Sequence, residues 1–519
     1  MARKAKVKPF TKILLLAAIG AGVFFGFQYA NNSGWFDSIA PKGAERGEIK
    51  KDSFAKLKKG GDNSIKIGVV TWGGYAGGQY FNKGFKPSKE SRFYKDYDLQ
   101  VEFKVIDDFN ASRAAWKSDE IDLLWITADA FPCEVNALKE YDPVIVFQAD
   151  WSRGGDAIVV KHDIGNAADL KGKKVAVAFG TPSQTFLFWF LNAGNMGLKD
   201  VQLVEVPSAV DAAAMFKAGR VDAAVVWSPD DEDCVNSVKG SKVLQSTKQA
   251  SNIIADVFYG KRKWVESHEE QLKGLVEGWM KGASEINSSP QARLEAAQVL
   301  ASGLNGVDLS FCKKAIENVR LCTYGDNKNF FGLNSDYQGV KGEDLYGTMS
   351  EVYQQVGVIS GMTPAWRTIT YTNILNSIQL DGLEHAAESK VTFTAPTKEV
   401  EKATSVATKI VRINFATGSA QLSSGAKFKI DDEVVPTLKA FANARVRIAG
   451  HTDNTGARTT NVTLSQSRAT SFKDYLVTEY GFDSNRFVVV GFGPDKPVAD
   501  NDSENGRSLN RRAEFEILN

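Results

Sequence analysis

Polar and aromatic side chains follow the short apolar runs in the first part of the sequence. Trp72, Gly73 and Tyr75 come directly after the first run, and Thr127 and Asp129 close or follow a later one. Ligands of open α/β sheets lie beyond the carboxyl ends of the strands. We therefore expect these positions to line a binding site, with aromatic rings as walls and hydroxyl and carboxylate groups as hydrogen-bonding partners.

A second set of such positions occurs further along the chain. It consists of Thr181, Ser183, Gln184, Trp227 and Asp230. Thr181 followed by Pro182 is typical of a capped helix start, whose free N–H groups attract an anionic group; the same pattern also serves simply to cap a helix. The acidic run 230–233 is compatible with an anionic solute only if its side chains face solvent as the first turn of the next helix. If Asp129 or Asp230 enters the site instead, a cationic or zwitterionic solute is predicted.

Catalytic and metal-binding patterns are missing from the sequence. The four histidines, at 162, 268, 385 and 451, do not lie in the loops described above. The cysteines at 133, 234, 312 and 322 do not cluster, so the spacing of a metal site is absent. No GxSxG, HExxH or P-loop motif occurs. We predict no enzymatic activity, no metal and no cofactor; Cys312 and Cys322 fit either a disulfide or two separate thiols.

Strand-like and helix-like segments alternate in a way that predicts an α/β fold. The predicted strands are 65–70, 99–106, 121–127, 157–160, 175–179, 201–206 and 222–227, and the predicted helices between them are 109–118, 130–139, 183–195 and 208–219. Continuous apolar runs separated by helices favour parallel sheets covered on both faces. Amphipathic helices follow at 263–286, 290–303, 309–318 and 342–357. We expect two α/β lobes, with Trp125 in the core of the first.

A linker and a smaller α/β unit end the sequence. Residues 386–408 are rich in Thr, Ala, Lys and Glu, as is typical of a linker. In 409–519, alternating apolar residues predict strands near 411–415, 446–448, 487–491 and 513–517, and helices at 425–443 and 464–480. This pattern indicates a small sheet with one exposed face.

The N-terminal residues predict a membrane anchor. Residues 1–12 carry five basic residues and no acid, and 13–31 are uncharged and mainly apolar. A helix over 13–30 would be about 27 Å long, enough to cross the hydrocarbon core, with the basic end in the cytoplasm. A cleaved signal peptide is the alternative, but a cut after Ala30 would place Gln28 where a small residue is required. Residues 32–63 are polar and form a linker.

Small residues recur every four positions within the predicted anchor. Ala18, Gly22 and Gly26 have the spacing that lets two membrane helices approach closely, which is compatible with a homodimer. Glycine is also common in membrane helices in general.

The composition of the 519 residues excludes several classes of protein. Lys and Arg number 63 and Asp and Glu 62, which gives a net charge of +1 and no basic surplus for binding nucleic acid. Hydrophobic residues make up 43% and charged residues 24%, as in ordinary globular proteins.

Four strings in residues 64–385 have a recognisable order. They are DWSRGGDAIVV (150–160), DLKGKKVAV (169–177), GTPS (180–183) and GRVDAAVVWSP (219–229). With this spacing the segment resembles the periplasmic solute-binding proteins of nitrate, sulfonate and taurine type ABC importers. The resemblance implies a two-lobed clamp that closes on a small-molecule solute by a hinge motion, with an ABC permease as partner.

A second set of strings occurs in residues 409–519. They are Asn414-Phe415, GHTDNTG (450–456), Asn461, LS (464–465), RA (468–469), GFG (491–493) and GRSLNRR (506–512). They resemble the OmpA-like peptidoglycan-binding domain. The resemblance implies that Asp453 and Arg468, fifteen positions apart, hold the diaminopimelate of the peptide stem, and that Thr452, Asn461 and Arg512 line the same site.

Together these features predict a single-pass protein of the bacterial inner membrane, with its N-terminus in the cytoplasm and the bulk of the chain in the periplasm. The expected role is solute uptake with an ABC permease, or solute sensing, by a clamp that is also attached to peptidoglycan. The alternative is a stator-like or scaffold subunit of a membrane complex, with the clamp as a structural or regulatory module. Segment 13–30 lacks the acidic residue that an ion-conducting stator needs.

Overall fold

The computed structural model describes residues 63–413, 415–416 and 418–518. The predicted anchor at 13–31, its dimerisation positions and nearly all of the first linker lie outside the described residues. Among the described residues, none of the helices has both the length and the apolar character needed to cross a membrane. The described part of the chain belongs to one compact unit.

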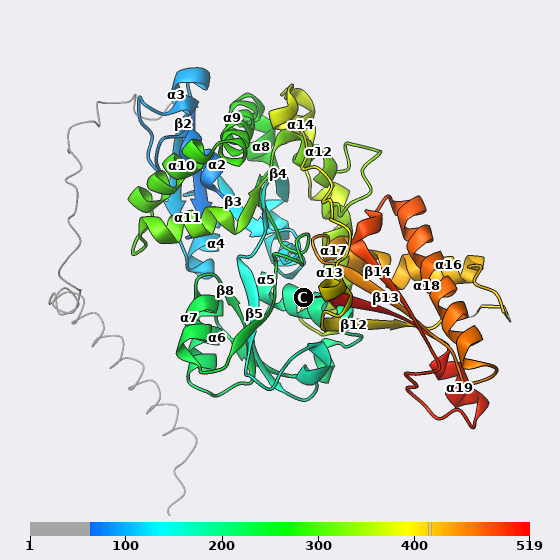
Figure 1. The fold of residues 1–519 in the computed structure, drawn as a ribbon. Helices are drawn as coiled ribbons and strands as arrows, with labels where there is room; N and C mark the ends of the chain where they lie inside the picture. Colours follow the sequence, from blue (N-terminus) through cyan, green and yellow to red (C-terminus); the bar gives the residue numbers. More distant parts are fainter. Residues whose placement is uncertain (1–62, 414, 417, 519) are drawn as a thin grey trace, which may run out of the picture. The chain divides into compact units, whose positions relative to one another are not determined.

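The first lobe is built on a mixed six-stranded sheet (Figure 1). In spatial order its strands are β11 (Val319–Leu321), β4 (Pro143–Ser152), β10 (Ala255–Lys261), β3 (Leu123–Thr127), β1 (Ser64–Val69) and β2 (Gln100–Val105). Strand β1 is parallel to β2 and β3, as predicted. Strand β10 is antiparallel to both β3 and β4. The prediction of a purely parallel sheet is therefore wrong, because strands that return from the second lobe enter this sheet in the opposite direction.

The second lobe contains a five-stranded sheet of the same mixed kind. Its strands, in spatial order, are β7 (Gln202–Val206), β6 (Lys174–Ala178), β8 (Ala223–Trp227), β5 (Asp156–Val160) and β9 (Lys242–Ser246). Strand β6 is parallel to β7 and β8, whereas β5 is antiparallel to β8 and β9. The helices of this lobe are α5 (Pro182–Ala193), α6 (Ala209–Lys217) and α7 (Asp230–Ser237). Helix α5 is buried along nearly its whole length, and its middle part, 186–191, consists entirely of apolar residues.

Two connections join the lobes. The chain passes from β4 to β5 through residues 153–155, and returns from β9 to β10 through 247–254. Thr247 ties the two connections together, because its Oγ1 accepts a hydrogen bond from Gly154 N at 2.8 Å and lies 2.9 Å from Ser152 Oγ. Gly154 has a φ of +124°, a conformation that favours glycine.

Helices cover the sheet of the first lobe. They are α2 (Ala76–Phe81), α3 (Arg92–Tyr97), α4 (Phe109–Lys117), α8 (Arg262–Ser267), α9 (Glu269–Ser288), α10 (Pro290–Gly303), α11 (Leu309–Glu317), α12 (Tyr324–Phe330), α13 (Gly342–Gln355) and α14 (Asn373–Ser377). On α9, the ring of Trp279 lies 5.1 Å from Phe147 and 5.0 Å from Phe258. The predicted helix at 130–139 is instead two short 3-10 helices, Phe131–Cys133 and Val135–Tyr141.

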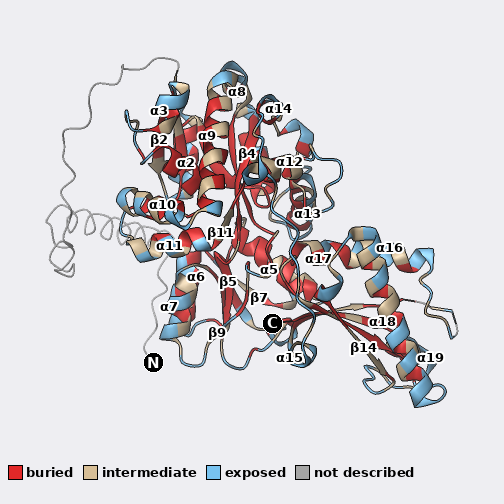
Figure 2. Ribbon diagram, turned by 45° about the horizontal axis from the view of Figure 1, so that its top comes forward, coloured by how far each residue is buried: buried red, intermediate tan, exposed pale blue. Residues whose placement is uncertain are grey.

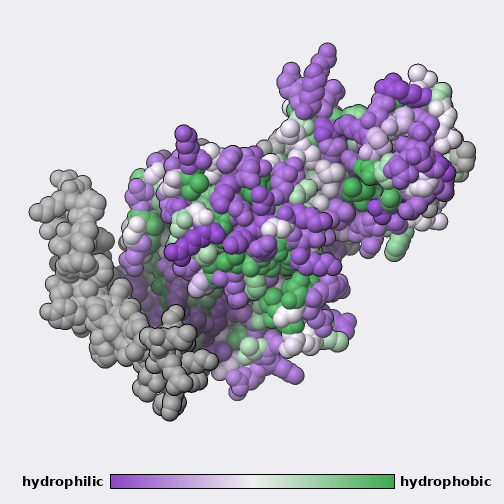
Figure 3. All heavy atoms as spheres, turned by 90° about the horizontal axis from the view of Figure 1, so that it is seen from below, coloured by the Kyte–Doolittle hydropathy of each residue, from purple (hydrophilic) through white to green (hydrophobic). Residues whose placement is uncertain are grey.

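Buried residues concentrate in the sheets and on the inner faces of these helices (Figure 2). On the face shown in Figure 3, hydrophilic residues cover most of the described surface. All four cysteines are free thiols, so Cys312 and Cys322 are separate and not bonded.

The C-terminal unit is a four-stranded sheet with helices on one face (Figure 1). Its strands, in spatial order, are β12 (Ser405–Val411), β15 (Ala513–Leu518), β13 (Val446–His451) and β14 (Phe487–Gly493). Its helices are α16 (Ser424–Glu433), α17 (Val435–Ala440), α18 (Arg458–Tyr480) and α19 (Glu504–Asn510), and the short α15 (Lys398–Glu401) precedes it. Strand β12 begins within the predicted second linker. The unit contacts the second lobe through Lys409, whose Nζ donates to Asn192 Oδ1 at 2.7 Å.

Helix α18 lies very close to the sheet at Gly450. A Cβ atom at this position would lie 2.3 Å from the backbone oxygen of Ser465. We predict that Gly450→Ala destabilises the C-terminal unit by about 1–3 kcal/mol, because a backbone contact cannot yield as a side chain can. Scanning calorimetry of the full chain should show a lower melting temperature for this unit alone.

Gly425, in helix α16, provides the matched control. A Cβ atom there would meet no atom within 4 Å. Gly425→Ala should leave the melting temperature unchanged or raise it slightly, because alanine favours a helix more than glycine does. Equal losses in both variants would contradict the proposed packing effect.

Candidate functional site

A cavity lies between the two lobes, where the strands of both sheets end. About 360 Å³ of space there is free of protein atoms, part of it open to solvent. It is lined by Val70, Thr71, Trp72, Tyr75, Trp125, Thr127, Asp156, Pro182, Trp227, Ile254 and Asp256. The sequence analysis named four of these residues as solute-binding: Trp72, Tyr75, Thr127 and Trp227.

The other predicted solute-binding residues lie near this cleft but do not line it. They are Gly73, Asp129, Thr181, Ser183, Gln184 and Asp230. Gly73 packs against helix α11, where a Cβ atom would lie 2.2 Å from Ala315 O. Asp230 opens helix α7, with the acidic run forming its first turn. Trp125, which we expected in the core, is 3% exposed and also lines the cleft.

Polar groups at the start of helix α5 are hydrogen-bonded to one another and to Trp227. The Oγ1 of Thr181 accepts from Ser183 N at 3.3 Å, and the Oε1 of Gln184 accepts from Gly180 N at 2.8 Å. Ser183 Oγ in turn accepts from Trp227 Nε1 at 3.1 Å. The N–H groups of Gly180 and Ser183, at the helix start predicted to attract an anion, are thus already bonded within the chain.

Sequence reasoning missed two acidic residues of the cleft, Asp156 and Asp256. Both come at the start of antiparallel strands, opposite residues that were predicted: Asp156 pairs with Trp227, and Asp256 pairs with Thr127. The beginning of an antiparallel strand lies at the same sheet edge as the end of its neighbour. The signal available in the sequence was an acidic residue at the start of each apolar run. Recognising it as a cleft residue required knowing the direction of the strand.

The cleft acids are held by hydrogen bonds from neighbouring side chains. Asp256 Oδ2 accepts from the Tyr75 hydroxyl at 2.6 Å, and Asp156 Oδ2 accepts from Ser152 Oγ at 2.7 Å. Asp150, on β4, accepts from Trp72 Nε1 at 2.7 Å. Tyr75, Ser152 and Trp72 thus fix the positions of the carboxyl groups around the cleft.

Burial changes the protonation of these acids. It raises the pKa of Asp129, Asp150 and Asp156 to about 7, because the charged carboxylate loses its hydration. The pKa of Asp256 is raised well above its ordinary value by burial, and further by the charge of Asp150. Both carboxylate oxygens of Asp129 are buried without a hydrogen-bond partner among the described residues.

One basic side chain approaches the aromatic wall from outside the cleft. The guanidinium of Arg113 lies 5.3 Å from the ring of Trp125 and 5.2 Å from that of Phe109. It is bound through Nε and an Nη atom to the two carboxylate oxygens of Glu134, each at 2.9 Å. Its charge is therefore already neutralised.

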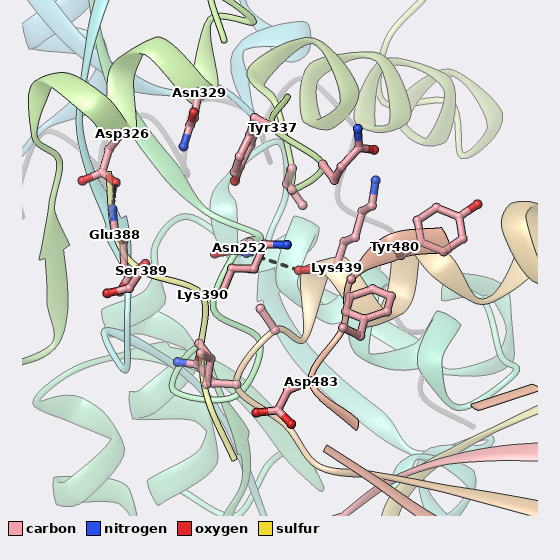
Figure 4. Close-up of a pocket in the computed structure, with 18 of the residues that line it drawn as sticks. Asn252, Asp326, Asn329, Tyr337, Glu388, Ser389, Lys390, Lys439, Tyr480 and Asp483 are labelled. Carbon is pink, nitrogen blue, oxygen red and sulfur yellow. Dashed lines mark hydrogen bonds between the residues drawn. The ribbon is translucent and has the colours of Figure 1, made fainter. Parts of the chain in front are cut away.

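A larger cavity is lined by residues of the first lobe, of the segment 388–393 and of the C-terminal unit (Figure 4). Its acids already have partners: Glu388 is 2.7 Å from Arg153, and Asp326 Oδ1 accepts from Glu388 N at 2.6 Å. Asn252 Nδ2 donates to Lys439 O at 3.3 Å across it. The interlobe cleft, whose polar groups lie at the strand ends of both lobes, is the better candidate for a solute site.

In the C-terminal unit, Asp453 lies two residues after the end of strand β13. Its Oδ1 accepts from Thr455 N at 2.9 Å, and its Oδ2 accepts from Arg511 at 2.7 Å. Burial opposes ionisation, but the hydrogen bonds from Arg511 and Thr455 outweigh it and lower the pKa of Asp453. Asn461 Nδ2 donates to Thr455 O at 3.0 Å, and Thr452 Oγ1 donates to Asp453 O at 2.8 Å. These contacts fix the loop that carries the carboxylate.

Two further arginines were predicted for the same site. Arg468, on α18, donates from Nε to Ser419 O at 3.0 Å, and its guanidinium lies 4.6 Å from the ring of Phe415. Arg512 is buried and donates to Glu514 at 2.7 Å and to Lys496 O at 3.1 Å. It is Arg511, which the sequence analysis did not name, that contacts Asp453.

Two family matches agree with this division of the molecule. Residues 62–301 match the NMT1-like family, and residues 414–511 match the OmpA family. The chain joins an NMT1-like domain to an OmpA-family domain.

Two relatives each match part of this chain. Outer membrane protein Omp38 of Acinetobacter baumannii is 43% identical over 102 residues, which are 20% of this chain and 28% of that protein. Peptidoglycan-binding protein ArfA of Mycobacterium tuberculosis is 32% identical over 187 residues, 36% of this chain and 54% of that protein. The chain thus spans only about a quarter to a half of these relatives.

One solved structure aligns with part of this chain. The periplasmic aliphatic sulphonate binding protein SsuA of Escherichia coli aligns with 61% of this chain and 99% of its own, with 18% identity and a TM-score of 0.47.

The raised pKa of Asp156 predicts how the stability of the NMT1-like domain depends on pH. The folded domain holds a proton on Asp156 up to about pH 7, whereas the unfolded chain releases it near pH 4. The free energy of unfolding of this domain should therefore fall as the pH rises from about 4 to 7 and remain at the lower value above pH 7. In solute-free protein at pH 8, Asp156→Asn should raise the free energy of unfolding by about 1–4 kcal/mol, since each pKa unit is worth about 1.4 kcal/mol.

Asp222, in the same lobe, provides a control, because its substitution should change the stability in the opposite direction. Burial opposes its ionisation, but hydrogen bonds from Lys174 N and Lys161 lower its pKa. Asp222→Asn should lower the melting temperature at pH 8, with an effect that fades below about pH 4. Melting curves across pH 2–8 measure both effects, and a gain at pH 4 equal to that at pH 8 for Asp156→Asn would contradict the assignment.

Proposed function

We propose that this chain is a cell-envelope protein that binds a small solute between the lobes of its NMT1-like domain while its OmpA-family domain holds peptidoglycan. The observation that carries the proposal is the pair Asp453 and Arg468. Both side chains belong to one small domain, and the charge of Asp453 raises the pKa of Arg468 while burial, the larger effect, lowers it.

The pair suits a ligand with both an ammonium and a carboxylate group, such as the diaminopimelate of a peptidoglycan stem. The carboxylate of Asp453 would receive the ammonium, and the guanidinium of Arg468 would receive the carboxylate in a charge-assisted hydrogen bond. Within the described residues, the terminal nitrogens of Arg468 make no hydrogen bond. The relative ArfA of Mycobacterium tuberculosis is a peptidoglycan-binding protein, which supports this proposal.

The two-lobed arrangement supports the solute-binding part of the proposal. Both lobes contribute strand ends to one cleft, and two backbone connections join them, which is the geometry of a hinged clamp. The cleft lining contains no His, Cys, Lys or Arg side chain. We therefore propose binding without catalysis.

The N-terminal anchor completes the proposal. Attachment to the inner membrane at one end and to peptidoglycan at the other would restrict the diffusion of the clamp. Restricted diffusion favours a sensing role, or delivery to a permease held nearby, over a shuttle that carries solute through the periplasm.

Binding to the cell wall can be tested by cosedimentation of the full chain with purified peptidoglycan. Asp453→Asn removes the charge that would pair with the ammonium, and Arg468→Lys removes the planar fork that would pair with the carboxylate. We expect each variant to lose at least about 1.5–3 kcal/mol of binding free energy, the usual contribution of a hydrogen bond to a charged group. This is roughly a tenfold or greater weakening.

Arg458→Lys is the matched control on the same helix. Arg458 is exposed and pairs with Asp495 at the start of α18. This variant should sediment with peptidoglycan as the unmodified protein does. Retention of Asp453→Asn and Arg468→Lys at the unmodified level would refute the proposed site.

A further inference from the structure

We propose that the interlobe cleft binds a small organic cation with an ammonium group, enclosed by aromatic rings and neutralised by Asp156 and Asp256. This inference rests on the proposed solute-binding role of the cleft and specifies the class of the solute. It differs from the anionic solutes that the resemblance to nitrate and sulfonate carriers implies.

The charge of the cleft is the first argument. Asp156 and Asp256 line it and are only 3% and 4% exposed. Asp129 and Asp150, both fully buried, lie close enough to influence the ionisation of Asp256. None of the lining residues is basic. An anion in this position would be repelled by any of these groups that is ionised, whereas a cation would stabilise the ionised form.

Unpartnered polar atoms are the second argument. The hydroxyl of Thr127 lines the cleft, is 2% exposed and makes no hydrogen bond within the described residues. Next to it in the sheet stands Asp256, its partner across the β3–β10 ladder. Asp150 Oδ1 is also buried without a partner. A buried acceptor without a partner is costly, so a donor such as an ammonium N–H group fits here.

The aromatic lining is the third argument. Trp72, Tyr75, Trp125 and Trp227 come from both lobes and surround the same cavity. Aromatic faces attract cations, and the attraction is strongest when water is excluded. Rings alone also suit neutral apolar ligands. The combination of rings with buried carboxylates favours an organic cation over a neutral apolar ligand. A metal ion is not favoured, since no group of His, Cys, Asp or Glu in the described residues is arranged to hold one.

The position of the two carboxylates would couple this cation to closure. Asp156 follows the first connection between the lobes, and Asp256 follows the second. The charge of Asp156 contributes to raising the pKa of Asp256, so the two ionised groups repel one another. A cation between them would replace this repulsion with attraction at the point where the lobes join.

Calorimetric titration of the full chain, purified in detergent at pH 8, tests the class of solute. The probes are tetramethylammonium and ethylammonium chloride, sodium methanesulfonate and nitrate, the neutral isostere tert-butanol, and calcium chloride. We expect saturable binding of at least one ammonium compound and at least tenfold weaker binding of every other probe.

Two variants locate the binding site. Asp256→Asn and Trp227→Leu should each weaken the binding of that ammonium compound at least tenfold. Asp230→Asn, in the acidic turn outside the cleft, should leave it unchanged. Unaltered cosedimentation with peptidoglycan and an unaltered or higher melting temperature would show that the variants are folded.

The pH dependence provides a further check. Tyr75, Asp129, Asp150 and Asp156 face Asp256, Asp231 acts on Asp156, and Arg113 acts on Tyr75. Because burial raises the pKa of Asp129, Asp150 and Asp156 to about 7, binding of the ammonium compound should weaken as the pH falls from 8 to 6.

The outcomes separate the two proposals. Binding of methanesulfonate, nitrate, calcium or tert-butanol in preference to both ammonium compounds would overturn the organic cation and leave the cleft as a solute site. Loss of ammonium binding in Asp230→Asn but not in Asp256→Asn would also overturn it. If none of the probes binds, the organic cation is overturned, whereas the solute-binding role is contradicted only if a broad panel of anions, amines and amino acids also fails to bind.

Discussion

The burial of several carboxyl groups where two lobes join is the constraint on which the clamp depends. Asp129, Asp150, Asp156 and Asp256 are all at most 4% exposed, and burial favours their protonated forms. Folding alone does not need this arrangement, because apolar residues would fill the same space at lower cost. Tyr75, Trp72 and Ser152 hold three of these carboxyl groups in place, so their positions are built into both sheets. A cost of this kind is typical of binding sites.

In the C-terminal unit the charged form of an acidic side chain is stabilised, whereas in the cleft burial favours the protonated form. Asp453 lies in a loop whose N–H group and Arg511 stabilise its negative charge, so its pKa is lowered. Arg468 lies on the neighbouring long helix, with its guanidinium against Phe415. Acid and base are both ionised before any ligand arrives, which suits a polymer that carries charges of both signs. The clamp instead has carboxyl groups whose charge develops most readily when a cation enters.

Sequence periodicity located most of the elements but could not give the direction of every strand. The carboxyl ends of β1, β3 and β8 follow from the pattern, and Trp72, Thr127 and Trp227 lie at or just after these ends. Strands β5 and β10 are antiparallel to their neighbours, so the residues that face the cleft begin these strands and do not end them. Asp156 and Asp256 were therefore missed. In the same way Arg511 and Arg512 are adjacent in sequence, and only the backbone path decides which one contacts Asp453.

Helix α5 physically connects the cleft to the C-terminal unit. Its first residue, Pro182, lines the cleft, and Ser183 accepts a hydrogen bond from Trp227 of the cleft wall. Near its other end, Asn192 accepts from Lys409 of β12, a lysine whose pKa is lowered by burial. Because the backbone hydrogen bonds of a helix make it stiff along its axis, a solute that displaced Trp227 or Pro182 would act on the contact with β12 more directly through α5 than through a loop. A single buried helix thus contacts both the cleft, where we propose that a solute binds, and the C-terminal unit, which we propose holds peptidoglycan.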